Sequence, residues 1–299
     1  MSKRTDSHTA IQVDDAFLRR WPLPEPSGSK RSRGEVLVVG GAPRSPGAAM
    51  LAGRAALRVG AGRLTLAVAG SVATAVAVEV AESGIVPLEE SSDGHVVGRS
   101  VRRAESDLAG ADAVLLGPGL DDIRETRRML RDAGGLVAPR ATVVLDAFAL
   151  GAIAGRPHLA RARSRILTPN LDEAELLLGR PRSRDAEGTR GADRDVTEIA
   201  RRYDAVVSCH STIASPDGRL FHILDGGPGL GTSGSGDALA GAIAGLAARG
   251  CDPVQAAVWG TALHAAAGRA LASEVGTLGF LAGEIVDRLP RELAAVEQR

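Results

Sequence analysis

Short apolar runs rich in β-branched residues alternate along the chain with longer segments of helical periodicity. Continuous apolar runs indicate strands that are buried on both faces, and their alternation with helices is typical of a mainly parallel sheet covered on both sides. The predicted strands are 36–39, 64–68, 113–116, 142–145, 165–168 and 205–208, and the helix-like segments include 47–59, 123–133 and 171–178. The pattern therefore predicts an α/β fold.

The last third of the chain no longer alternates between strands and helices. The sequence Ser215-Pro-Asp-Gly218 has turn chemistry and predicts a β-hairpin between residues 211–214 and 220–224. Beyond residue 237 the pattern becomes helical, over 238–249, 253–272 and 280–289. Residues 181–195 are highly charged, and we expect them to form a solvated loop.

No stretch rich in proline, glycine or serine divides the body of the chain. We expect residues 1–33 to form a polar N-terminal arm, packed on the domain and partly disordered, and residues 34–299 to form a single domain. The N-terminus lacks the apolar segment of a signal peptide, and the longest uncharged stretch, 64–78, is too short to span a bilayer. The sequence predicts a cytoplasmic protein.

Charge and composition exclude several classes of function. The 36 lysines and arginines balance 36 acidic residues, so the chain has no net positive charge of the kind that attracts nucleic acid or an anionic membrane. Lysine occurs only at Lys3 and Lys30, which excludes a Schiff-base lysine and a P-loop lysine from the domain. The two cysteines, Cys209 and Cys251, cannot form a disulfide framework or a multi-cysteine zinc site.

Glycine is abundant, with 37 residues, and much of it follows predicted strands. Parallel strands bring their carboxyl ends to one edge of a sheet, where open α/β folds bind ligands. The strand ends that carry glycine, proline or a carboxylate are 40–47, 117–119, Asp146, 168–170 and 226–231. Because five strand ends carry such residues, the sequence predicts that they line one shared cleft.

The strongest local feature is Gly231-Thr-Ser-Gly-Ser-Gly-Asp237, which leads directly into a predicted helix. Such a turn directs several backbone N–H groups and the positive end of the helix at one point, which suits an anion. Asp237 is then placed to take a proton from a hydroxyl group that attacks a phosphate. The alternative is that Asp237 only caps the helix, but three glycines in the six residues before it favour the site.

Three other motifs favour structural roles. Gly241 and Gly245 are spaced for close packing between helices. His264 lies on a very apolar predicted helix, and we expect a hydrogen-bonded core residue rather than a ligand. Cys209 and His210 are adjacent in a predicted strand, so their side chains point to opposite faces and do not form a nucleophile pair.

The chain resembles the NAD(P)H-hydrate dehydratases, which are nicotinamide-nucleotide repair enzymes with a ribokinase-like fold. The resemblance covers nearly the whole chain and rests on the order and spacing of residues 33–41, 46–49, 55–62, 116–120, 144–147, 167–173, 231–237 and 257–264. It implies a lyase that removes the water wrongly added to the dihydronicotinamide ring of NADH or NADPH. ADP or ATP drives this reaction by phosphorylating the ring hydroxyl, which then leaves as phosphate.

The resemblance also implies roles for individual residues. Asp237 is the expected general base and contacts the substrate, and Ala48, Gly119 and Asn170 match positions that contact the hydrate. The expected nucleotide- and phosphate-binding residues are Gly234, Ser235, Gly236, Ser208, Cys209, His210, Ser211 and Thr212. Mg²⁺ is expected on the phosphates, although the sequence holds no dedicated cluster of metal ligands. A homo-oligomer is also expected.

Two departures from the family pattern concern the nucleotide and the substrate. The family commonly has Lys-Gly-x-x-Thr where this chain reads Ser208-Cys-His-Ser-Thr212, and histidine where it has Asn170. Backbone amides around residues 234–236, an arginine or Mg²⁺ would have to replace the lysine. Two other functions stay open: a ribokinase-like kinase of a small-molecule alcohol, and a catalytically inactive nucleotide-binding protein.

Overall fold

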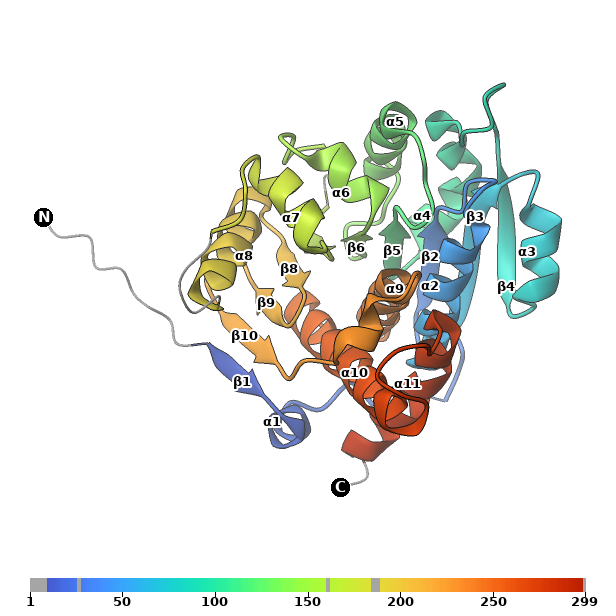
Figure 1. Ribbon diagram of the computed structural model, residues 1–299. Coiled ribbons are helices and arrows are strands. Elements are labelled where there is room, and N and C mark those ends of the chain that lie inside the picture. The colour runs from blue at the N-terminus through green and yellow to red at the C-terminus, as the bar shows by residue number, and fades with distance from the viewer. Residues whose placement is uncertain (1–9, 26–27, 160–161, 184–188, 298–299) are drawn as a thin grey trace, which may run out of the picture.

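A sheet of ten strands, covered by helices on both faces, forms the frame of the molecule (Figure 1). The computed structural model describes residues 10–25, 28–159, 162–183 and 189–297. The strands are β1 (Ile11–Val13), β2 (Glu35–Val39), β3 (Arg63–Ala69), β4 (Ser83–Leu88), β5 (Ala113–Leu116), β6 (Thr142–Leu145), β7 (Ser164–Leu167), β8 (Val206–Cys209), β9 (Thr212–Ala214) and β10 (Leu220–Ile223). The helices are α1 (Asp15–Arg20), α2 (Pro46–Arg58), α3 (Ala73–Glu79), α4 (Glu105–Gly110), α5 (Ile123–Gly134), α6 (Phe148–Ile153), α7 (Leu171–Leu178), α8 (Thr189–Tyr203), α9 (Ser235–Ala248), α10 (Pro253–Glu274) and α11 (Ala282–Glu297), with short 3₁₀ helices η1 (Gly98–Ala104) and η2 (Pro228–Gly231).

The strand order is β1-β10-β9-β8-β7-β6-β5-β2-β3-β4. Strands β2 to β8 pair in parallel, β9 is antiparallel to β8 and β10, and β1 is parallel to β10. The carboxyl ends of β2, β5, β6, β7 and β8 therefore reach the same edge of the sheet. The predicted α/β class with a mostly parallel sheet is confirmed.

Two apolar layers lie on the two faces of the sheet. The first is shared with α2, α9, α10 and α11, and the second with helices α4 to α8. Strand β5 supplies both layers because successive side chains of a strand point to opposite faces: Leu115 belongs to the first, and Val114 and Leu116 belong to the second. Burial on both faces explains why this strand has no polar residue.

The predicted helices after residue 237 are present as α9, α10 and α11. A Cβ atom at Gly241 would lie 2.0 Å from the carbonyl oxygen of Ala52, and one at Gly245 would lie 2.5 Å from that of Ala56. Helices α9 and α2 therefore pack too closely for side chains at these glycines, as predicted. Within the described residues, no helix combines the length and the apolar character that a membrane crossing needs.

Part of the predicted N-terminal arm belongs to the sheet. Strand β1 pairs with β10, and the ring of Trp21 stacks on Phe221 at a centroid distance of 6.2 Å. The backbone oxygen of Trp21 also accepts a hydrogen bond of 2.9 Å from Trp259 Nε1. Residues 1–9 and 26–27 lie outside the described residues, so the division of the chain into an arm and one domain stays a prediction.

The expectation of a solvated loop over 181–195 was wrong at its C-terminal end, because α8 begins at Thr189. Its side chains Val196, Ile199, Ala200 and Tyr203 follow helical spacing and pack in the second apolar layer. Of the charged side chains described in this part of α8, Arg194 is exposed, Asp193 is half-buried and Asp195 is buried. Residues 184–188 of the predicted loop lie outside the described residues.

Candidate active site

The loops that follow β2 and β5 touch each other at the carboxyl edge of the sheet. Gly41 N donates a hydrogen bond of 2.8 Å to Pro118 O. Gly119 has a φ of 69°, and a Cβ atom there would lie 2.3 Å from Ser45 O and 3.1 Å from Ala48 Cβ. Ala48 and Gly119, both predicted to contact the substrate, are therefore neighbours, and the close approach of the two loops requires glycine at position 119.

The turn before α9 is open on one side. Gly234 is the N-cap residue, with a φ of 88°, and it has no side chain to cap the helix. A Cβ atom at Gly234 would lie 2.5 Å from Leu51 Cδ1, whereas nothing lies within 4 Å of one at Gly236. The first turn of α9 therefore directs backbone N–H groups toward open space beside Gly236, which suits a phosphate group.

Asp237 lies in this first turn and is partly buried. Burial and, to a smaller extent, the negative charge of Glu173 together raise its pKa from 3.8 to about 6. Most Asp237 side chains are therefore ionised at neutral pH, yet they bind a proton more readily than an ordinary aspartate. These are the properties of a general base that works near pH 7.

Asp146 follows β6 and is buried at the same edge. Its Oδ1 accepts a hydrogen bond of 2.8 Å from Thr168 Oγ1, which follows the neighbouring strand β7. Burial raises the pKa of Asp146 to about 8, and the charges of Asp237 and Glu173 contribute to this rise. Asp146 therefore holds a proton at neutral pH, while Asp237 does not.

Asn170 and Glu173 form the start of α7. The side-chain oxygen of Asn170 accepts hydrogen bonds of 2.9 Å from the backbone N–H groups of Asp172 and Glu173. Asn170 N donates to Glu173 Oε2 at 2.9 Å, which completes a capping box. The oxygen of Asn170 thus serves the helix, and its NH₂ group is the part that can donate to a substrate.

Three acidic side chains on different elements are thus coupled through their charges: Glu173 acts on Asp146 and Asp237, and Asp237 acts on Asp146. Of these three, the sequence assigned a role only to Asp237. Asp146 was predicted only as one of the strand ends that line the cleft, and Glu173 was given no role, although both follow adjacent parallel strands, which was the available signal. In the described part of the chain, no group of three or more His, Cys, Asp or Glu side chains is placed to hold a metal ion.

His264 contacts the first residue of α9, directly after the glycine-rich turn. Its Nε2 lies 3.0 Å from both the hydroxyl and the backbone oxygen of Ser235. The ring is buried, and burial lowers its pKa to about 4, so it is neutral at physiological pH. The expected core role of His264 is confirmed. Ser235 itself is buried, so its hydroxyl faces the histidine.

The predicted nucleotide segment 208–212 crosses from β8 to β9. Ser208 Oγ lies 2.8 Å from Thr261 Oγ1 in the core, and burial raises the pKa of the Cys209 thiol to about 12. Both side chains therefore face into the protein. The other three residues of the segment lead through the turn between β8 and β9 at the carboxyl edge. His210 is exposed and has a φ of 56°, and Ser211 and Thr212 are half-buried.

Two surface hollows lie away from this edge. One, of about 210 Å³, is lined by residues at the starts of β2 and β3, including Glu35 and Arg63. The other, of about 380 Å³, includes Arg165 near the start of β7. Both lie at the amino-terminal ends of the strands, whereas the glycine-rich turns and Asp146, Glu173 and Asp237 lie at the carboxyl edge. The chemistry therefore locates the candidate site at the carboxyl edge.

Fold and site together define an α/β protein of the ribokinase-like class in which a glycine-rich turn begins a helix at the carboxyl edge of the sheet. A ribokinase-like protein of Enterococcus faecalis shares this fold, with a TM-score of 0.79 at 21% identity over 97% of each chain. The family model for NAD(P)H-hydrate dehydratase matches residues 36–291. The chain belongs to the NAD(P)H-hydrate dehydratase family, which confirms the resemblance and the predicted hydro-lyase function.

Two relatives show how far the similarity extends. A Xanthomonas campestris protein named ADP-dependent (S)-NAD(P)H-hydrate dehydratase is 44% identical over 290 residues, which cover 93% of this chain and 97% of that protein. The ADP/ATP-dependent NAD(P)H-hydrate dehydratase of Bacillus subtilis, co-crystallised with ATP and Mg²⁺, has a TM-score of 0.78 at 27% identity. That likeness covers 97% of this chain and all of the other.

Proposed function

We propose that this cleft uses ADP to dehydrate hydrated NADH or NADPH, with Asp237 as the general base. The observation that carries the proposal is the position of a mostly ionised carboxylate in the first turn of a helix whose start has no side-chain cap. A hydroxyl group and a phosphate brought together there would meet both a proton acceptor and an array of N–H donors.

In the proposed reaction, Asp237 removes the proton of the ring hydroxyl as the hydroxyl oxygen attacks the terminal phosphate of ADP. The bond to the departing AMP breaks, and backbone N–H groups at residues 234–236 stabilise the charge on the transferring group. The new phosphate ester then leaves as inorganic phosphate when its C–O bond breaks. The electron pair of the ring nitrogen assists this cleavage and leaves an iminium ion. Loss of a proton from the adjacent ring carbon to the departing phosphate then restores the reduced nicotinamide.

The remaining predicted residues would bind rather than react. Ala48 and Gly119 are neighbours where the loops after β2 and β5 meet, and both are partly exposed, so the substrate would contact them through a methyl group and through backbone. The NH₂ group of Asn170 can donate a hydrogen bond to the substrate but cannot titrate near neutral pH. The turn of His210, Ser211 and Thr212 lies at the same edge and would contact the nucleotide.

Mg²⁺ fits this site as a partner of the phosphates. The charge of Glu173 raises the pKa of Asp237, and the charges of Asp237 and Glu173 raise that of Asp146, so the edge has a local excess of negative charge. Oxygen ligands of this kind suit Mg²⁺, which proteins commonly bind with one or two carboxylates and the phosphates of a substrate. Glu173 is the carboxylate that would hold it beside the phosphates, because Asp237 has to stay free to accept the proton. When bound, Mg²⁺ would neutralise charge on the phosphates.

The test is recovery of the absorbance of reduced nicotinamide from hydrated NADH and hydrated NADPH, run in parallel with ADP, with ATP and without nucleotide. We expect recovery that depends on nucleotide and is faster with ADP. Absence of recovery with both nucleotides would contradict the proposal. A stable phosphorylated alcohol formed from ATP would instead support a kinase, and nucleotide binding without turnover would support an inactive binding protein. The predicted homo-oligomer stays a prediction.

A further inference from the structure

The order of the strands sets the side of the cleft on which each ligand extends. In a phosphoryl transfer the attacking and leaving oxygens lie roughly in line, so the two ligands approach the phosphate from opposite sides. Helix α9, whose start would hold this phosphate, packs against β5 and β6. The predicted nucleotide segment 208–212 follows β8, on one side of these strands, whereas β2 lies on the other. The hydrate would therefore extend over the loops that follow β5 and β2.

The loop after β2 is held against the loop after β5. Ala42 N donates to Gly119 O at 2.9 Å, and Ser45 N donates to Ala42 O at the same distance. The carbonyl oxygen of Ser45 lies 2.3 Å from the place of a Cβ atom at Gly119, which is a predicted substrate contact. Arg44 is bonded to Ser45, so its Cα atom is about 4 Å from that of Ser45. The backbone of Arg44 is consequently fixed beside the substrate contact.

The packing of α2 on α9 also brings Arg44 level with the glycine-rich turn. A Cβ atom at Gly241 would lie 2.0 Å from Ala52 O, and the same offset between the two helices recurs one turn later, so they run parallel and in register. Five residues back along both helices, Gly47 of α2 is level with Gly236 of α9. Arg44 precedes Gly47 by three residues and therefore lies at the rim of the same cleft, on its β2 side.

The side chain of Arg44 is free to bind a ligand. It is exposed, and it forms no hydrogen bond or ion pair with any other residue that the structure describes. A guanidinium group offers planar, paired N–H donors that fit the oxygens of a phosphate. Because the backbone of the loop is already held in place, binding would cost mainly the ordering of this one side chain.

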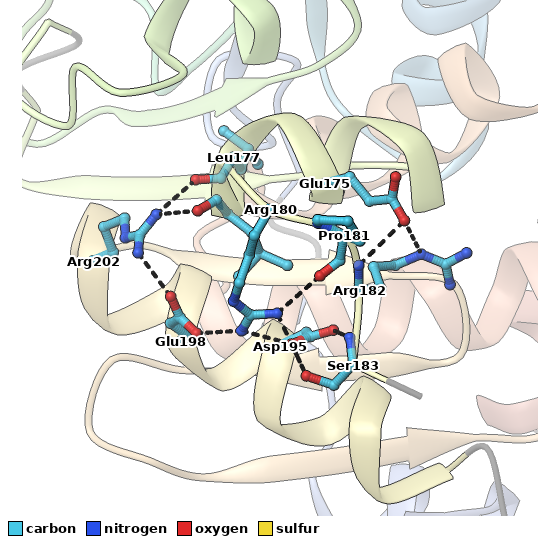
Figure 2. Close-up of polar contacts among 10 residues, drawn as sticks. Glu175, Leu177, Arg180, Pro181, Arg182, Ser183, Asp195, Glu198 and Arg202 are labelled. Carbon is cyan, nitrogen blue, oxygen red and sulfur yellow. Dashed lines mark hydrogen bonds and ion pairs between the residues drawn. The ribbon is translucent and has the colours of Figure 1, made fainter. Parts of the chain in front are cut away.

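Arginines on the β7–β8 side of the sheet are used differently. Arg180 Nη2 donates to Asp195 Oδ1 at 2.9 Å, and the same group pairs with Glu198. Arg202 Nη2 donates to Glu198 at 2.7 Å. Figure 2 shows these side chains directed at one another, where they join the end of α7 to α8. Their guanidinium groups serve the fold, in contrast to that of Arg44.

We propose that Arg44 binds the pyrophosphate group that joins the two halves of the hydrated dinucleotide. In this substrate one ribose separates the pyrophosphate from the reacting ring, so a ring beside Gly119 brings the pyrophosphate within reach of a long side chain that starts next to Ser45. The inference rests on the proposed function, which brings the hydrate and ADP to the same turn. Arg44 thus selects a dinucleotide, and it treats hydrated NADH and NADPH alike because both contain the pyrophosphate.

The experiment compares the wild-type protein with Arg44→Gln, Arg44→Lys and Arg201→Gln. Calorimetric titrations with hydrated NADH, hydrated NADPH and ADP, each added alone, measure binding without turnover. Arg201 is the matched control because it is exposed in the last turn of α8, at the opposite edge of the sheet, and forms no ion pair within the described part of the chain. Thermal unfolding checks the fold, and all three variants should unfold at nearly the wild-type temperature.

We expect Arg44→Gln to bind both hydrates about tenfold more weakly, because charge-assisted hydrogen bonds to a phosphate are lost. Its affinity for ADP should stay within about twofold of wild type. Arg44→Lys keeps the charge without the paired donors and should recover part of the loss. Arg201→Gln should bind all three ligands as wild type does. In turnover, Arg44→Gln should raise the KM for the hydrate and leave kcat and the KM for ADP nearly unchanged.

Unchanged affinity for the hydrates in Arg44→Gln would overturn the proposal, as would a loss confined to ADP. A loss confined to hydrated NADPH would also overturn it, because Arg44 would then contact the 2′-phosphate. An equal loss in Arg201→Gln would reduce the effect to net charge and have the same consequence. If the wild-type protein binds the hydrates without nucleotide-dependent turnover, and Arg44→Gln weakens that binding, the proposed function fails and this inference stands.

Discussion

Glu173 and Asp237 belong to different helices, yet the charge of Glu173 raises the pKa of Asp237. Helix α7 begins after β7, and α9 begins after the glycine-rich turn, so the fold alone brings the two carboxyl groups to one edge. The interaction between the two carboxyl groups helps to set the pH at which Asp237, the proposed general base, loses its proton. Its consequence can be measured as a pH dependence.

We predict that kcat/KM for the hydrate, at saturating ADP, falls below an apparent pKa of about 6, because protonated Asp237 cannot accept the hydroxyl proton. Glu173→Gln should move this limb to lower pH, since removal of a neighbouring negative charge favours the ionised form of Asp237. Glutamine can still accept the hydrogen bond of the capping box. A limb that stays in place in Glu173→Gln would contradict the coupling, and Glu175→Gln on the same helix should leave it unchanged.

Asp146 should make the protein less stable as the pH rises. Its pKa is higher in the folded protein, about 8, than the ordinary value of 3.8, so the folded state holds a proton that the unfolded chain releases between these values. Its contribution to stability is therefore present below about pH 4 and lost as the pH rises to 8.

Asp146→Asn, which keeps an acceptor for Thr168, should remove this pH dependence. We expect the variant to gain up to a few kcal/mol over wild type between pH 5 and 8, because each pKa unit corresponds to about 1.4 kcal/mol. Urea unfolding of both proteins at several pH values measures the difference. Parallel curves with a constant offset would show that Asp146 ionises normally.

Two glycines of the turn before α9 should respond differently to alanine. Gly234→Ala introduces a Cβ atom 2.5 Å from Leu51 Cδ1 at a positive φ and should destabilise the fold by about 1–3 kcal/mol. Gly236→Ala meets nothing within 4 Å and should keep its stability, while its methyl group blocks the approach of the phosphate. Thermal unfolding and the KM for ADP distinguish these effects. Normal kinetics in Gly236→Ala would place the phosphate elsewhere.

His264 should matter for stability rather than for proton transfer. Its pKa, lowered to about 4 from 6.5, means that the folded protein resists protonation of this ring. This residue therefore contributes stability above pH 6.5 that is lost as the pH falls toward 4. We expect His264→Ala to lose about 2–4 kcal/mol at pH 7, through a cavity and the unpaired hydroxyl of Ser235. The acid limb of kcat/KM should keep its pKa in this variant if Asp237 causes it.

The sequence pattern predicts the strands of the sheet centre well because they are buried on both faces. Leu115 and its neighbours form an uninterrupted apolar run, which sequence periodicity detects. Strand β4 escapes detection because it lies at the edge of the sheet, contains Pro87 and has few buried residues. The three-residue β1 is recognisable only from its pairing with β10.

The sequence predicts the backbone turn of the candidate site well, but it predicts the protonation states of the acidic side chains poorly. Gly234 and Asp237 follow from local spacing, since a turn and the helix after it are adjacent in the chain. The protonated state of Asp146 depends on burial and on Asp237, which lies 91 residues further along the sequence. Such relationships require the fold.

Replacement of Asp237 tests the central claim most directly. Asp237→Asn keeps the size of the side chain and removes its ability to take a proton, so the fold and the affinity for ADP should be retained. We predict that phosphate release from ADP in the presence of hydrated NADH falls by a factor of 10² or more, the usual contribution of a general base. A variant that releases phosphate and restores reduced nicotinamide at nearly the wild-type rate would contradict the assignment of Asp237 as the base.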